Sequence, residues 1–127
     1  MADIKIYNVD ALGKPVGPYS HVARVKSAET LYIAGMLAPG ESFEKQCAAV
    51  YAQVEQALKS AGAGWRNVVQ FTTYLVHSQD IAAFYRWREQ NYPKMFPDGR
   101  YPPNTLLIID RLVQEQFLIE VQTVAAL

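Results

Sequence analysis

The fold of this chain is decided by the stretches Arg100-Tyr-Pro-Pro-Asn-Thr-Leu-Leu-Ile-Ile-Asp-Arg-Leu112 and Phe117-Leu-Ile-Glu-Val-Gln-Thr-Val-Ala125. Each contains a short apolar run of β-branched and large aliphatic side chains, which predicts two buried strands joined by a turn at residues 113–116. Side chains alternate between the two faces of a strand. In the second run we therefore expect four side chains to face the core: Ile119, Val121, Thr123 and Ala125.

One acidic residue, Glu120, interrupts the second run and falls on the face opposite to these core side chains. A carboxylate in an apolar environment is costly unless it has a partner. We therefore expect Glu120 to line a cleft or a subunit interface rather than to meet a hydrophobic layer.

The rest of the chain combines short strand-like runs with two amphipathic helices. Strands are predicted at residues 4–7, 21–25, 29–36 and 68–76. Helices are predicted at residues 43–61, with Ser42 as N-cap, and at 79–92, with Ser78 as a candidate cap and Pro93 ending the helix. Together with the two closing strands, this order predicts an α+β domain in which two helices cover one face of a mixed six-stranded sheet. The other face has no helix to cover it, which predicts an oligomer.

Length and composition exclude several classes of protein. A chain of 127 residues predicts a single domain, residues 1–127. Twelve basic and twelve acidic residues cancel, and no basic block occurs, so neither nucleic-acid binding nor an anionic membrane surface is expected. The single cysteine, Cys47, excludes an internal disulfide, and the absence of a signal peptide or long apolar run predicts a cytoplasmic protein.

Metal and nucleotide sites are not expected either. The two histidines, His21 and His77, stand far apart without cysteines or paired carboxylates at ligand spacing, and no glycine-rich phosphate loop occurs. Cys47 lies on the apolar stripe of the first helix, where we interpret it as a small buried side chain rather than a nucleophile. We therefore predict a protein without metal or cofactor.

Candidate binding groups occur in a loop and on the second helix. Gly17 and Pro18 make the backbone rigid just before Tyr19, Ser20 and His21, which suits a binding loop; the alternative is a turn whose tyrosine covers the core. Arg88 shares a side of the second helix with the apolar stripe. Two interpretations stay open: an arginine that extends from the edge of the stripe to solvent, which we prefer, or an anion-binding arginine at a cleft.

In its motifs the chain resembles the RidA (YjgF) family. The motifs are Gly17-Pro-Tyr-Ser-His21, Leu31-Tyr-Ile-Ala-Gly35, Val68-Val-Gln-Phe-Thr-Thr-Tyr-Leu75 and Ile119-Glu-Val-Gln-Thr-Val-Ala125. The resemblance implies a chorismate-mutase-like α+β fold and a homotrimer with small-molecule clefts between neighbouring subunits. It also implies hydrolysis of reactive enamine or imine intermediates, made by pyridoxal-phosphate enzymes, to 2-oxo acids and ammonia.

The resemblance also assigns roles to individual residues. Tyr19 matches the family's loop tyrosine, and Glu120 matches the last-strand glutamate that positions or activates water. Asn104 stands where the family has its carboxylate-binding arginine, and Ala34-Gly-Met36 replaces a Ser-Gly-Gln motif. The helical asparagine of the family falls near Arg88 or Glu89. Since an amide binds a carboxylate less strongly than an arginine, either Arg88 or Arg100 supplies the missing charge, or the ligand differs.

Glu120 and Tyr19 are therefore the expected catalytic residues. The expected substrate-binding residues are Asn104, Arg88, Arg100, His21 and Ala34. We predict a deaminase-like hydrolase with altered specificity; the alternative is a non-catalytic trimer that binds a small metabolite or protects other proteins. RNA cleavage, which is sometimes attached to the family, is disfavoured by the zero net charge and the lack of a basic, aromatic-lined groove.

Overall fold

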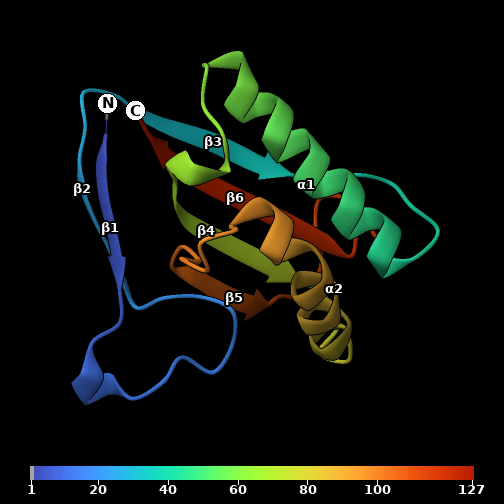
Figure 1. Cartoon of the computed structure of the whole chain (residues 1–127). Coiled ribbons are helices and arrows are strands. Elements are labelled where there is room, and N and C mark those ends of the chain that lie inside the picture. Colours follow the sequence, from blue (N-terminus) through green and yellow to red (C-terminus); the bar gives the residue numbers. More distant parts are fainter. Residues whose placement is uncertain (1) are drawn as a thin grey trace.

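The computed structural model describes residues 2–127, and over them six strands and two α-helices occur. A hairpin of β1 (Asp3–Tyr7) and β2 (Val22–Lys26) comes first, followed by β3 (Thr30–Met36) and α1 (Phe43–Ser60). The second half contains β4 (Val68–Leu75), α2 (Asp80–Met95), β5 (Asn104–Ile108) and β6 (Ile119–Ala126). Both helices lie on one face of a sheet formed by β3, β6, β4 and β5 (Figure 1). The α+β class is confirmed.

The single six-stranded sheet predicted above is wrong. The described residues form a two-stranded sheet, β1–β2, and a separate four-stranded sheet in the order β3-β6-β4-β5 (Figure 1). The reason lies in the short connection between β2 and β3, where the amides of Ala28 and Glu29 both donate to the carbonyl of Leu127. These bonds attach the connection to the end of β6, so β2 pairs with β1 alone.

The two closing strands are not neighbours, because β4 lies between them. β5 runs parallel to β4, from the pair Phe71/Asn104 to the pair Leu75/Ile108, and β6 runs antiparallel to β4. A parallel pair needs a long crossover, which α2 provides. The predicted turn exists, since Phe117 donates to Gln114, but it is only part of a connection at residues 109–118 that carries the chain past β4.

The face assignment of β6 is confirmed. Ile119, Val121, Thr123 and Ala125 are fully buried beneath the helices, together with Phe71 of β4. From α1 the core receives its apolar stripe: Phe43, Cys47, Val50, Val54 and Leu58. Burial raises the pKa of the Cys47 thiol, so this side chain is held in its neutral form, as expected of a packing residue.

The second helix differs from its prediction at both ends. It begins after Gln79, and Ser78 gives no side-chain cap. It continues through Pro93 to Met95. A proline in the last turn removes one helical hydrogen bond, but the amide of Phe96 donates to the carbonyl of Tyr92 at 2.7 Å and closes the turn. Tyr92 is buried beside Phe96, with ring centroids 5.2 Å apart, and this packing holds the last turn against the sheet.

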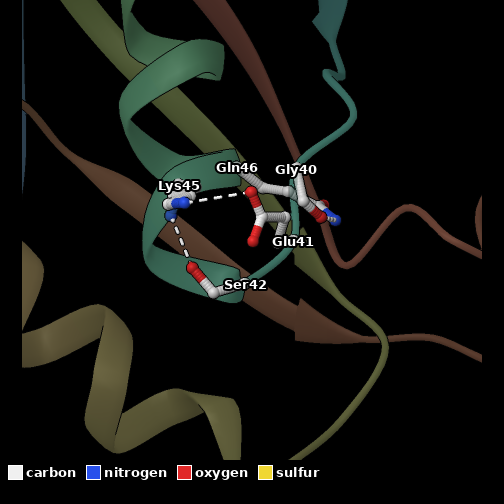
Figure 2. A network of polar contacts seen from close by, with 5 residues as sticks. All are labelled: Gly40, Glu41, Ser42, Lys45 and Gln46. Atoms are coloured by element: carbon white, nitrogen blue, oxygen red, sulfur yellow. Dashed lines mark hydrogen bonds and ion pairs between the residues drawn. The ribbon is translucent and has the colours of Figure 1, made fainter.

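The beginning of α1 is fixed by two polar side chains of different burial. Ser42 caps the helix, because its hydroxyl accepts from the amide of Lys45 (Figure 2). Gln46 is 1% exposed; its Nε2 donates to the carbonyls of Gly40 and Gln116, and its Oε1 accepts from the amide of Leu118 at 2.8 Å. Gln46 therefore ties α1 to the chain just before β6, and so helps to place Glu120.

We expect Gln46→Leu to lower the free energy of unfolding by about 2 kcal/mol, because it leaves partly buried backbone groups of residues 116 and 118 without partners. Urea unfolding measures this change. Lys45→Gln is the matched control: its side chain makes an exposed pair with Glu41 at 3.2 Å, whose loss costs about 0–1 kcal/mol. Equal effects of the two substitutions would contradict the role given to Gln46.

Among residues 2–127, no helix combines the length and the apolar character needed to cross a membrane.

Candidate functional site

Glu120 lies on the face of the four-stranded sheet that the helices do not cover. It is the second residue of β6, and its neighbour across the sheet is Tyr74 of β4. The side chain is half-buried, and burial raises the pKa of its carboxyl above the usual value. Desolvation alone produces this shift, so the carboxylate is poised to accept a proton more readily than a solvated glutamate.

A bulge in β3 makes room for this carboxylate. Ile33 pairs with Thr123 and Met36 pairs with Val121, so Ala34 and Gly35 together stand opposite one residue of β6. A Cβ atom built on Gly35 would lie 2.0 Å from Oε2 of Glu120, which shows that the carboxylate occupies the space above the glycine. The structure thus brings Glu120 together with the predicted binding residue Ala34, which is exposed in the same bulge.

The uncovered face carries polar and apolar side chains in a mixed layer. Tyr32 of β3 is 81% exposed, and Leu107 of β5 is 39% exposed. Tyr74 and Val124 are partly buried on the same face. No helix of residues 2–127 packs here, since both lie on the opposite side (Figure 1).

The loop that carries Tyr19 is held by α2. The hydroxyl of Tyr85 donates to the carbonyl of Val16 at 2.9 Å, and its ring lies so close to Gly17 that a Cβ there would approach it to 2.7 Å. The hydroxyl of Tyr19 accepts from the amide of Val16 in turn. A larger residue at position 17 would therefore displace the Tyr85 ring from the loop, and this close approach explains part of the rigidity that the sequence predicts.

His21 fastens the other end of this loop. Its Nδ1 accepts from the amide of Val9 at 3.0 Å, and its own amide donates to Oδ1 of Asn8. Because Nδ1 serves as an acceptor, the neutral imidazole carries its proton on Nε2. Ser20 is buried beside it.

Arg88 is buried, which contradicts our preferred interpretation of an arginine that reaches solvent. Only 1% of the residue is exposed, and its guanidinium carbon lies 4.1 Å from the ring centroid of Phe84 and 4.8 Å from that of Tyr85. It borders a cavity of about 580 Å³ between α2, the Tyr19 loop and Tyr101. The apolar rings replace the solvent that the arginine would otherwise reach.

Asn104 and Arg100 lie apart from each other and from Glu120. Asn104 begins β5, where its Oδ1 accepts from the hydroxyl of the fully buried Thr73 at 2.7 Å. It faces the helices, because its register partner is Phe71 of the core. Arg100 forms an exposed pair with Asp98 at 2.9 Å and borders a different cavity, of about 160 Å³. One chain therefore places Asn104 and Glu120 on opposite faces of the sheet.

Sequence reasoning missed three residues that shape the site. Tyr85 and Tyr101 line the Arg88 cavity, and Gly35 provides the space for Glu120. Two of them left a signal: Tyr85 is three residues before Arg88 and so lies on a neighbouring part of the same helix face, and a glycine inside a strand often marks a bulge or a close approach. Tyr101 left none, because it lies in an irregular segment.

Among residues 2–127, no cluster of three or more histidines, cysteines or carboxylates is suited to a metal ion.

Comparisons with known proteins give the family. The model of the family described as Endoribonuclease L-PSP matches residues 10–127, nearly the whole chain. The chain belongs to this Rid (YjgF) family. A RutC family protein from Synechocystis is 29% identical, over 98% of this chain and 97% of its own.

Solved structures of the Rid family agree with this membership. A Rid family protein from Yersinia pestis is 27% identical, with a TM-score of 0.82 and 98% of both chains covered. RidA from an Antarctic Psychrobacter is 22% identical, with a TM-score of 0.69 over 97% of this chain and 99% of its own, which shows a shared fold. The resemblance found in the motifs is thus confirmed at the level of the family.

Proposed function

We propose that this Rid protein hydrolyses a small imine or enamine and releases ammonia, with a substrate specificity that differs from that of relatives carrying an arginine at position 104. The observation that carries this proposal is the carboxylate of Glu120, which is half-buried, raised in pKa by burial and seated over Gly35 on an uncovered sheet face. A carboxylate whose pKa is raised by burial is a stronger base than a solvated glutamate, and so is suited to general-base catalysis.

In the proposed reaction, Glu120 takes a proton from water as the water oxygen attacks the carbon of the C=N bond. The imine nitrogen receives this proton, which gives the neutral carbinolamine. The hydroxyl proton of the carbinolamine then moves to nitrogen through Glu120 as the C–N bond breaks, so that ammonia leaves and the carbonyl forms. An enamine first gains a proton on its β-carbon and loses one from its nitrogen, and so becomes the imine. Tyr19 donates a hydrogen bond to the polarised atom of the substrate. Water is the only co-reactant, and atoms balance as imine plus water giving ketone plus ammonia.

We further propose a homotrimer whose subunits share each site. One chain places Glu120 and the bulge on the uncovered face, whereas Asn104 lies on the face that the helices cover and Arg88 belongs to α2. A neighbour that packs on the uncovered face would bring its own Tyr19 loop and Asn104 to the first chain's Glu120. His21 fastens this loop, and Ala34 lines the same cleft as Glu120.

Light scattering after size exclusion is expected to give three times the 14.3 kDa of the single chain. A monomer mass at micromolar concentration would contradict the shared site, because the two sets of residues would then have no way to meet.

A second function is favoured by one observation, the bond between Asn104 and Thr73. An amide already held by a neutral hydroxyl is a weak carboxylate anchor compared with an arginine. The second candidate is therefore a trimer that binds a metabolite without turning it over. Ligands that raise the melting temperature without being consumed would support it. RNA cleavage is not favoured, because a chain with zero net charge has no excess of positive charge to bind the RNA backbone.

The decisive experiment measures ammonia and 2-oxo acid release from 2-iminopropionate, generated in place by an amino-acid oxidase. The rate with the protein is compared with the uncatalysed rate. We expect acceleration that is proportional to protein concentration. If neither this substrate nor imines of larger amino acids are hydrolysed faster, the proposed hydrolase activity is contradicted. The second candidate, a trimer that binds a metabolite without turning it over, then remains.

A further inference from the structure

A buried cation without an anionic partner borders the cavity next to the Tyr19 loop. Arg88 is 1% exposed, and within residues 2–127 its guanidinium takes part in none of the ion pairs, which are all on the surface. Its Nε is buried and has no hydrogen-bond partner. A buried charge left in this way is costly, and proteins rarely keep one without a use.

Aromatic rings stabilise this cation only in part. The guanidinium carbon lies 4.1, 4.8 and 5.9 Å from the ring centroids of Phe84, Tyr85 and Tyr92. These contacts attract the cation, and the Tyr92 hydroxyl is a hydrogen-bond partner of the guanidinium, but neither the rings nor a hydroxyl carry the negative charge of a carboxylate. The arginine is therefore held in place before any ligand arrives, which lowers the entropy cost of binding one.

Rings of proline and tyrosine make up much of the remaining lining of the cavity. They belong to Pro15, Pro18, Tyr85 and Tyr101. Tyr85 is fixed by its bond to Val16, and Tyr101 packs against Tyr92 with ring centroids 5.5 Å apart. Such rings offer flat faces against which a planar, apolar side chain packs. The single acidic residue of the lining, Glu89, is exposed.

The cavity is bordered by the loop that carries one of the proposed catalytic residues. Pro18, which lines the cavity, immediately precedes Tyr19. Glu120 lies on the other face of the sheet, so a ligand in this cavity would meet the Glu120 of a neighbouring subunit in the proposed trimer.

We propose that this cavity binds small carboxylic acids with a planar, apolar side chain, and that Arg88 is the residue that binds their carboxylate. This inference rests on the proposed function, because it names the class of substrate: imines of aromatic amino acids, whose carboxylate is held by Arg88 and not by residue 104. Arg88 belongs to α2, whereas residue 104 belongs to β5. A substrate whose carboxylate is bound by Arg88 therefore lies along a different wall of the site from a substrate bound by an arginine at position 104.

The test compares phenylacetate with phenylacetamide, which have the same shape and differ in charge, by isothermal titration calorimetry on the assembled protein. We expect phenylacetate to bind about tenfold or more tightly than the amide, and acetate to bind weakly. Arg88→Gln should remove the preference for the charged ligand. Arg86→Gln is the matched control: it changes an exposed arginine on the same helix, and should leave binding unchanged.

A second variant keeps the test decisive where Arg88→Gln does not fold. Glu89→Gln removes the one negative charge of the lining from an exposed position, so it should fold and tighten phenylacetate binding by about threefold, with phenylacetamide unaffected. Equal binding of acid and amide to the unmodified protein would overturn the inference. So would a charge preference that survives in folded Arg88→Gln, or an unchanged affinity in Glu89→Gln.

The outcomes separate this inference from the hydrolase. Binding of phenylacetate through Arg88 without turnover of any imine would uphold the pocket and contradict the proposed reaction. Turnover of 2-iminopropionate with no charge-dependent binding of phenylacetate would uphold the reaction and contradict the pocket.

Discussion

Glu120→Gln is expected to lower the rate of imine hydrolysis by about 10²- to 10⁴-fold, the range that a lost general base accounts for. Glutamine keeps the size of the side chain and its place over Gly35, but it cannot take a proton from water. Because the pKa shift of Glu120 arises from burial alone, the neutral amide is not expected to lower stability. Ammonia release under single-turnover conditions measures the effect.

The pH profile identifies the group that is lost. Burial raises the pKa of Glu120, and only its ionised form is a base, so the rate of the unmodified protein should fall as pH decreases through this raised pKa, at a higher pH than for a solvated glutamate. The residual rate of Glu120→Gln should lack this acidic limb. Glu115→Gln, which changes an exposed carboxylate, should keep both rate and profile. A limb that persists in Glu120→Gln would assign the base to another residue.

Local patterns in the sequence predicted much of this structure. Alternation alone placed the four core residues of β6 and put Glu120 on the other face, because a strand has only two faces. Helical spacing placed Cys47 in the core, and Ser42 marked the beginning of α1. In each case the physical cause of the feature, strand alternation, helical spacing or a helix cap, is contained in a few residues that are close together in the sequence.

Features that depend on distant residues were not predictable in the same way. The separation of the β1–β2 hairpin from the main sheet depends on bonds between residues 28–29 and the carbonyl of Leu127, far along the chain. The depth of Arg88 depends on how closely Tyr85 and Phe84 enclose it. A helical stripe gives the direction of a side chain but not its distance from solvent.

The opposite faces of Glu120 and Asn104 follow from register, which no short pattern contains. Each residue is correctly placed in its own strand by alternation. Their relation depends on β4, which pairs Phe71 with Asn104 and Tyr74 with Glu120, an odd number of residues apart. Glu120 and Asn104 can therefore belong to one site, as the resemblance to the Rid family implies, only if a second subunit contributes one of them.

Gly35→Ala is expected to lower imine hydrolysis to nearly the level of Glu120→Gln while leaving the protein folded. The added Cβ would lie 2.0 Å from Oε2 and 2.6 Å from Cδ of Glu120, so the carboxylate must leave its position over the bulge. Cγ of Glu120, at 2.8 Å, must shift as well, but all of these atoms belong to one flexible side chain. Gly35 is not among the positive-φ glycines of the described chain, so alanine adds no backbone strain there. The expected loss of stability is therefore within about 1 kcal/mol.

Gly64→Ala is the matched control for this substitution. Gly64 has extended backbone angles, φ −144° and ψ −172°, and a Cβ there would meet no atom within 4 Å. It should change neither the rate nor the melting temperature by a measurable amount. If Gly35→Ala keeps full activity, the position of the carboxylate over the glycine is not the one that it takes in catalysis. If Gly35→Ala loses activity together with most of its stability, the bulge acts by holding β3 on β6, and the specific role of the space above Gly35 is refuted.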